Sequence, residues 1–356
     1  MAKIEEFMSN DLDSTLNYYI RNGFQPHPYY YNCSLIDNPN GTPRPFLGIY
    51  FMVAGTILLS VYIPCLYIIS QSDLMKSSCY KIMLYLGLMD VCCISVNSLT
   101  TGFLGFIGAT FCSYPRIIYL AGAIGVGCWM GSCSTCILLA INRCCDINHH
   151  LWFRGMFMGN NVYITMMIPI TYTTYAILFT KPILFNSNYM SWFFNPFLGL
   201  DADYYVNFPH TINNCCVSLC QTLMYVYLMM LIAHKNRHAQ SDALSKTQKQ
   251  IFIQSIIICS FNATAAYIYV YMQFFYSPPF VILIGQLAWQ CAHGCVCMVY
   301  ITMNKSIRRK VIQLMVPDMI KKRAKIRKNT LTIIRPAMSI MGSDATKSTQ
   351  NSGTLF

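Results

Sequence analysis

Seven long runs of mostly apolar residues follow one another along the chain, separated by shorter polar segments. Each has about the 20 residues that a helix needs to cross the hydrocarbon core of a bilayer. The fourth and fifth runs are the least apolar, because Pro169 and several threonines and cysteines dilute them. We therefore predict an all-α membrane protein, a bundle of seven transmembrane helices that span Phe46 to Ile69, Ile82 to Ile107, Ile117 to Ile141, Val162 to Thr180, Val217 to Ala233, Ile251 to Phe275 and Phe280 to Met303.

A different pattern follows the seventh run. Ile307, Val311 and Leu314 fall near one helical face, while the basic residues 308–310 lie largely away from it, and Pro317 ends the pattern. This predicts a short amphipathic eighth helix over residues 304–316 on the membrane surface. The order of parts is then an N-terminal tail at 1–45, the bundle at 46–303, this helix, and a basic, largely disordered tail at 317–356.

Composition agrees with lipid as the main solvent. The chain is 55% hydrophobic and 11% charged, with a mean hydropathy of +0.41, which leaves too little polar surface for a water-soluble protein. The net charge is +12, and residues 305–356 hold 12 of the 25 Lys and Arg. A basic tail after the last helix suits anionic lipid, so we expect the lipid bilayer as a partner and no nucleic acid.

The distribution of positive charge predicts the orientation. If the N-terminus is outside, the inner loops and the C-terminal tail carry 20 of the 25 Lys and Arg. Because cytoplasmic segments are enriched in these residues, we expect the N-terminus outside and the C-terminus inside. Asn32 and Asn40 begin two glycosylation sequons in the predicted outer tail, which agrees with this orientation.

A few polar side chains lie inside the predicted helices, where contact with lipid is costly. Asp90 is the only acidic residue in the seven runs, and it is either a hydrogen-bonded carboxyl or a cation or proton site. One face of the seventh run lines either a cavity or a polar seam between helices. That face carries Gln286, Trp289, Gln290 and His293. In the sixth run, Tyr267 and Tyr271 form either a cavity wall or part of an aromatic belt at the interface.

Enzyme motifs are absent from the sequence. It contains no GxSxG, no HExxH and no P-loop. Cys133 and Cys136 have CxxC spacing, but their helix supplies no further metal ligands. We therefore expect no enzyme, no cofactor and no metal site.

Six segments of the chain resemble the nematode serpentine chemoreceptors of class T, the Srt family of seven-transmembrane G-protein-coupled receptors. They are "SCYKIMLYLGLMDV", "GATFCSYP", "LLAINRCCD", "SWFFNPF", "FNATAAYIYVYMQFF" and "WQCAHGCVCMVYITMNKSIR". The resemblance implies a chemosensory receptor in the plasma membrane of sensory neurons, which binds a small ligand outside and signals to a heterotrimeric G protein inside. The alternative is a membrane transporter or channel with Asp90 as its coupling-ion residue.

The resemblance to rhodopsin-like receptors also implies roles for single residues. Arg143 in "NRC" corresponds to the arginine that contacts the G protein, and Asn142 replaces the acidic residue that usually restrains it. Asp90 and Ser132 correspond to a sodium-binding polar network, which we expect to include His293. Tyr300 resembles the activation-related tyrosine near the inner end of the seventh helix, although "GCVCMVY" replaces the usual Asn-Pro.

The ligand and disulfide expectations rest on the same resemblance. Because few charges line the outer half of the bundle, we expect a small, largely uncharged ligand. The residues expected near it are Trp192, Tyr267, Tyr271, Gln286, Trp289 and Gln290. Cys112 lies where such receptors anchor a disulfide, and its candidate partners are Cys33 and the pair Cys215 and Cys216. We favour Cys33.

Overall fold

The computed structural model describes residues 12–36, 38–71, 73–237 and 246–315. The chain divides into two compact units, residues 1–308 and 309–356. The first unit contains every helix discussed below except α11 (Lys305–Met315), which crosses the boundary between the units. The predicted basic tail, residues 317–356, lies outside the described residues, as do residues 1–11 of the predicted N-terminal tail.

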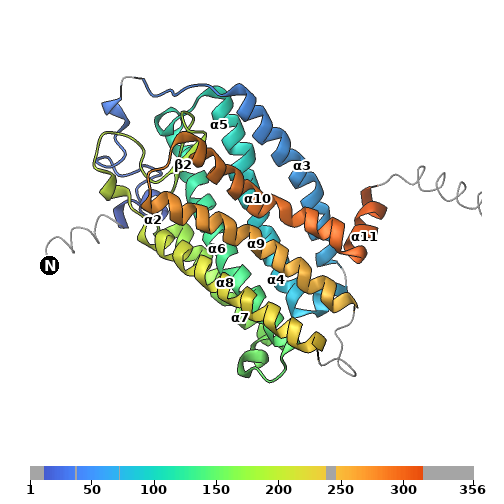
Figure 1. Ribbon diagram of the computed structural model, residues 1–356. Helices are drawn as coiled ribbons and strands as arrows, with labels where there is room; N and C mark the ends of the chain where they lie inside the picture. Colours follow the sequence, from blue (N-terminus) through green and yellow to red (C-terminus); the bar gives the residue numbers. More distant parts are fainter. Residues whose placement is uncertain (1–11, 37, 72, 238–245, 316–356) are drawn as a thin grey trace, which may run out of the picture. The chain divides into compact units, whose positions relative to one another are not determined.

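Among the described residues, seven helices are long and apolar enough to cross a membrane. They are α3 (Pro45–Ser70), α4 (Ser78–Ile94) continued by α5 (Thr101–Ile107), α6 (Pro115–Ile147), α7 (Asn161–Phe179), α8 (Phe208–Arg237), α9 (Lys246–Phe274) and α10 (Pro279–Met303), which lie side by side (Figure 1). The predicted seven-helix, all-α membrane protein is confirmed. Two boundaries differ clearly: α8 begins at Phe208 instead of Val217, and α6 continues to Ile147 instead of Ile141.

The outward-facing side chains of the bundle are apolar. Ile57, Ile164, Ile168 and Leu219 are each more than half exposed. Large apolar side chains exposed on several helices of the bundle need lipid around them. The chain is therefore a multi-pass membrane protein.

The helix α6 lies at the centre of the bundle, where it contacts α4, α7, α8 and α9 (Figure 1). Two of its glycines face α7. A Cβ atom at Gly127 would meet Ile177, and one at Gly131 would meet Thr173. Glycine at these positions lets the two backbones approach closely.

The second transmembrane segment is interrupted by a π-helical turn, Ser95–Thr100, between α4 and α5. Two threonine hydroxyls donate hydrogen bonds to backbone carbonyls of this turn: Thr100 Oγ1 to Ser95 O at 2.9 Å, and Thr101 Oγ1 to Val96 O at 2.9 Å. Such single wide turns often occur at functional sites because they change which side chains face inward. Here the turn buries Asn97 and Ser98 completely.

A hairpin of β1 (Leu184–Asn186) and β2 (Ser191–Phe193) lies between α7 and α8 in the chain. The strands are antiparallel, and Phe185 pairs with Trp192. Both strands contact helices of the bundle, β1 with α6 and β2 with α10. The hairpin therefore covers one end of the bundle, which we call the disulfide end; the opposite end, where α6 finishes, is the Arg143 end.

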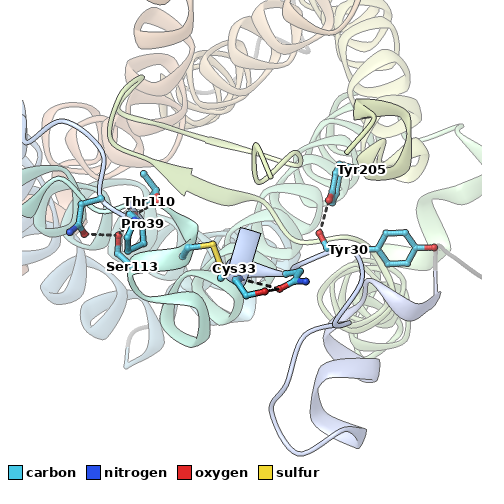
Figure 2. The surroundings of a disulfide bond; sticks show 10 residues. Tyr30, Cys33, Pro39, Thr110, Ser113 and Tyr205 are labelled. Atoms are coloured by element: carbon cyan, nitrogen blue, oxygen red, sulfur yellow. Dashed lines mark hydrogen bonds between the residues drawn. A yellow bond between two sulfur atoms is a disulfide. The ribbon is translucent and has the colours of Figure 1, made fainter. Parts of the chain in front are cut away.

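The N-terminal segment packs onto the disulfide end instead of extending away from it. The helix α2 (Leu16–Arg21) buries Tyr19, whose ring stacks on that of Tyr119 at 4.7 Å between centroids. The Tyr205 hydroxyl donates to Tyr30 O at 2.5 Å, and Figure 2 shows this bond beside the disulfide. Burial raises the pKa of the Tyr205 phenol to about 12, so this hydroxyl stays neutral at physiological pH.

Cys33 and Cys112 form a disulfide, with 2.04 Å between the sulfur atoms, and this is the pairing that we favour above (Figure 2). Cys215 and Cys216, the alternative partners, are free. Next to the disulfide, the hydroxyls of Thr110 and Ser113 both donate to Pro39 O, at 2.5 and 2.7 Å. The disulfide and these bonds fasten the N-terminal segment to the start of α6.

Replacing Cys112 with serine is expected to lower the stability of the protein by about 2–5 kcal/mol, the usual cost of losing a native disulfide. Thermal unfolding of the purified full-length protein in detergent measures this. The matched control is Cys216→Ser, which removes an exposed free thiol and should leave the midpoint unchanged. Equal midpoints for the two variants would show that the disulfide carries no stability.

The predicted eighth helix, residues 304–316, coincides with α11. Asn304 precedes it, and its side-chain Oδ1 accepts from the backbone N–H of Ile307 at 3.1 Å. An asparagine at this place is a favourable N-cap and separates α11 from α10. That α11 lies on a membrane surface stays a prediction.

Candidate ligand cavity and polar seam

A cavity of about 210 Å³ opens at the disulfide end between the hairpin and the helices α6, α8, α9 and α10. Its wall is rich in aromatic residues and contains no Asp, Glu, Lys or Arg. Its polar and indole-bearing wall includes Trp129, Trp192, His210, Gln286 and Trp289. An enclosed, largely apolar space with a few polar groups is typical of small-molecule sites.

Three of the six residues predicted near a ligand line this cavity. Trp192 comes from β2, while Gln286 and Trp289 come from α10. Gln290 is also buried, but its Nε2 donates to Ser98 Oγ at 2.9 Å and it does not line the cavity. The spacing on α10 thus identifies the correct face, of which only the outer part borders the cavity.

Tyr267 and Tyr271 do not line the cavity. Each side chain is nearly half exposed on the outside of the bundle, at 48% and 46%. The Tyr267 hydroxyl bonds to Thr222 and Ser218 of α8, and the ring of Tyr271 stacks on Phe275. Their face of α9 meets α8 and the outside of the bundle, so they lie away from this cavity, and a ligand contact at either residue stays a prediction.

His210 and Trp129 belong to the cavity wall, although sequence reasoning missed both. His210 was missed because the fifth helix was predicted to begin only at Val217. A signal was present: Asn207 caps the helix by accepting from the backbone N–H of His210 at 3.0 Å, and Pro209 occupies its first turn. Both residue types are favoured at helix starts.

A set of buried polar groups, the polar seam, lies along α10 from the cavity in two hydrogen-bonded groups. Its members are Asn97, Ser98, Gln286, Gln290, Asp90 and His293. Gln286 Nε2 donates to Asn97 O at 3.0 Å, and Asn97 Nδ2 donates to the backbone O of Trp289 at 3.3 Å. The π-helical turn therefore ties the second transmembrane segment to the cavity-lining part of α10.

The part of the seam nearer the Arg143 end contains the buried carboxyl of Asp90. His293 Nδ1 lies 2.7 Å from Asp90 Oδ1, and the Tyr62 hydroxyl donates to Asp90 Oδ2. Both carboxyl oxygens are therefore engaged. Ser132 lies beside this carboxyl, but its hydroxyl has no hydrogen-bond partner among the described residues.

Tyr300 continues the line toward the Arg143 end. Its ring is fully buried and meets Tyr62 edge-on, with 5.9 Å between centroids. The Tyr300 hydroxyl has no hydrogen-bond partner in the part of the chain that the structure describes. Tyr62 is therefore in contact with both Asp90 and Tyr300.

Arg143 is buried near the end of α6, with 5% exposure. Its Nη1 pairs with Asp146 Oδ2 at 2.8 Å, and its guanidinium lies over the ring of Phe252 of α9 at 5.9 Å. Asn142 instead donates to Ser78 Oγ at 2.9 Å. Asn142 has no carboxylate to pair with Arg143, and Asp146, about one turn later in α6, supplies one instead.

The two predicted glycosylation asparagines lie at the disulfide end. Asn32 Oδ1 accepts from the hydroxyl of Ser34 at 2.6 Å, and Asn40 Oδ1 lies 3.1 Å from Ser113 Oγ. Asn32 is partly buried and Asn40 is exposed. Glycosylation at either residue stays a prediction.

Comparisons with known proteins agree with this architecture. The family model described as "Serpentine type 7TM GPCR chemoreceptor Srt" matches residues 14–324. The chain is 26% identical to "Serpentine receptor class T-55" of Caenorhabditis elegans over 278 residues, which cover 77% of this chain and 76% of that protein. The crystal structure of squid rhodopsin shares the fold, with a TM-score of 0.54 at 14% identity, over 78% of this chain and 91% of that one. Because the family model covers most of the sequence, the chain belongs to the Srt family of serpentine seven-transmembrane chemoreceptors.

Proposed function

We propose that this protein is a chemosensory receptor of the plasma membrane, which binds a small ligand in the cavity and signals to a heterotrimeric G protein at the Arg143 end. The observation that carries the proposal is the polar seam, which extends along α10 from the cavity wall at Gln286 to the buried pair of Asp90 and His293. In the predicted orientation, with the N-terminus outside, the cavity faces the exterior.

The seam offers a way for a ligand to act at a distance. A ligand in the cavity would touch Gln286 and Trp289 of α10. Hydrogen bonds join these two residues to Asn97 of the π-helical turn. If the ligand favours one position of α10 over another, it shifts the balance between two packings of α10 against α4. Asp90 and His293 lie on the same two helices, so their contact changes with that packing.

At the Arg143 end, the present packing hides the residue proposed to face the G protein. Phe252 of α9 and Asp146 of α6 cover the guanidinium of Arg143. A partner could reach this guanidinium only after Phe252 moves away. We infer that the structure represents a resting packing and that signalling requires displacement of α9 from α6.

The transporter or channel alternative needs Asp90 as an open ion site. Tyr62 and His293 occupy both oxygens of its carboxyl, which favours a hydrogen-bonded structural role. The receptor proposal therefore has the stronger support. By family resemblance, we expect the membrane of sensory neurons as its location.

Responses of reporter cells to a panel of volatile compounds test the receptor proposal. Gln286→Ala and Trp289→Ala should each reduce the response to an activating compound by about tenfold or more, since each removes part of the cavity wall. The matched control is Tyr271→Ala, which truncates an aromatic outside the cavity and should leave the response unchanged. Unchanged responses in both α10 variants, at normal surface expression, would contradict the proposal.

A further inference from the structure

We propose that the cavity selects a small neutral molecule that carries a carbonyl oxygen, such as a ketone or an ester. This inference rests on the proposed function, because it names the class of ligand for the same cavity. It comes from the hydrogen-bonding groups in the wall, which differ in whether the protein already uses them.

Three tryptophans line the cavity, and two of their indole N–H groups have partners. Trp129 Nε1 donates to Asn214 Oδ1 at 2.9 Å, and Trp192 Nε1 donates to Thr101 Oγ1 at 2.7 Å. Trp289 differs, since its Nε1 has no hydrogen-bond partner among the described residues although its side chain is only 3% exposed. An indole N–H can only donate, so this cavity-lining residue carries a buried donor without a partner.

The second free group is His210 Nδ1, and its neighbours determine that it is a donor. Asn214 Oδ1 accepts from the indole of Trp129, so the Nδ2 group of Asn214 must face the other way, toward His210. That Nδ2 lies 3.4 Å from His210 Nε2. Since an amide nitrogen only donates, His210 Nε2 accepts, and the proton of the neutral imidazole is on Nδ1.

His210 Nδ1 has no partner in the described part of the chain. Two residues that line the cavity, Trp289 and His210, therefore each carry a buried N–H donor that no described residue satisfies. Gln286, which also lines the cavity, uses both ends of its amide: Nε2 donates to Asn97 O and Oε1 accepts from Ser191. No lining side-chain atom among the described residues is a buried acceptor without a partner.

The two unsatisfied N–H donors lack an acceptor, so the ligand that suits them is one that supplies an acceptor. A carbonyl oxygen only accepts, and its two lone pairs can be satisfied by N–H donors. A carboxylate also accepts, but in this wall it would be buried without a cation. The wall contains no Lys, Arg, Asp or Glu, and the volume of about 210 Å³ limits the ligand to a small molecule.

The test compares matched pairs of compounds that differ only in the acceptor. Acetophenone is paired with α-methylstyrene and cyclohexanone with methylenecyclohexane, so that a C=CH2 group replaces C=O. Binding to the purified full-length receptor in lipid nanodiscs is measured by saturation-transfer NMR. Water solvates a carbonyl better than an alkene, so an apolar cavity without free donors would prefer the alkene.

We expect at least one ketone to bind about tenfold more tightly than its alkene partner, the effect of about one or two hydrogen bonds. Trp289→Phe and His210→Phe should each reduce this ratio severalfold. Trp192→Phe should weaken both members of a pair alike, because its N–H is already used by Thr101. Trp152 is 88% exposed and is not among the residues that line the cavity. Trp152→Phe should therefore change neither affinity.

Alkenes that bind as tightly as their ketones, or a ratio that survives both Trp289→Phe and His210→Phe, would overturn the inference. Failure of every pair to bind would overturn it as well. The receptor proposal is tested separately, because nanodisc binding needs no G protein. Ketone binding without signalling would contradict only the proposed function, while equal signalling by ketones and alkenes would contradict only the ligand class.

Discussion

Asp90→Ala is expected to destabilise the bundle by about 3 kcal/mol or more. The substitution removes the partner of the Tyr62 hydroxyl and of His293 Nδ1, and both groups are fully buried. Each orphaned buried group costs about 1–3 kcal/mol, and the lost side-chain volume adds to this. Thermal unfolding of the receptor in nanodiscs, together with its level at the cell surface, measures the effect.

Asp90→Asn is the matched control, and we expect it to cost about 1 kcal/mol or less. The asparagine Oδ1 can accept from Tyr62, while its Nδ2 can donate to His293 Nδ1 once the imidazole proton moves to Nε2. That move breaks no bond, because His293 Nε2 has no partner among the described residues. If the alanine variant were as stable as the asparagine variant, the hydrogen bonds of Asp90 would not hold the bundle together.

Asp146→Asn is expected to raise the ligand-independent activity of the receptor about fivefold. Asp146 pairs with Arg143 through the one guanidinium nitrogen that has a partner, whereas Nε and Nη2 have none in the described residues. Because the Asp146 side chain is 41% exposed, water screens the pair, and about 1 kcal/mol is a reasonable value for it. That energy corresponds to a shift of about fivefold between packings.

Basal nucleotide exchange on a G protein, at equal receptor density, measures this change. The control is Asp73→Asn, which removes a second pair of the same spacing, Asp73 with Lys76, on a fully exposed surface. That variant should leave basal activity unchanged. Arg143→Ala should abolish ligand-dependent exchange, and a normal response from it would reduce Arg143 to a membrane-surface anchor.

The fold was predictable because lipid imposes a simple rule. A transmembrane helix must contain about 20 apolar residues, and this rule identifies all seven segments. It fails at helix ends that continue with polar residues, as at the start of α8 around His210. It also misses the N-terminal packing, since contacts such as Tyr19 on Tyr119 follow no helical period.

The site was predictable only in part. Helical spacing shows which side chains share a face, and it correctly grouped Gln286, Trp289 and His293 on α10. Spacing does not show what that face meets, so the same reasoning placed Tyr267 near a cavity that it does not reach. The role of Asp146 was available from its spacing of three residues after Arg143.

The π-helical turn could not be read from the sequence. Thr100 and Thr101 help to satisfy its carbonyls, but hydroxyl residues are common in ordinary transmembrane helices as well. Without the turn, the pairing of Asn97 with α10 cannot be anticipated. The link between the cavity and Asp90 therefore emerges only from the three-dimensional arrangement.

The central claim is that the cavity and the Arg143 end are parts of one receptor. The most direct measurement uses the purified protein in sealed vesicles with a heterotrimeric G protein, and follows nucleotide exchange and ligand flux in the same preparation. We predict that a cavity ligand accelerates exchange without crossing the membrane, and that Trp289→Ala removes the acceleration. Ligand or ion flux without any change in nucleotide exchange would contradict the account and favour a transporter or channel.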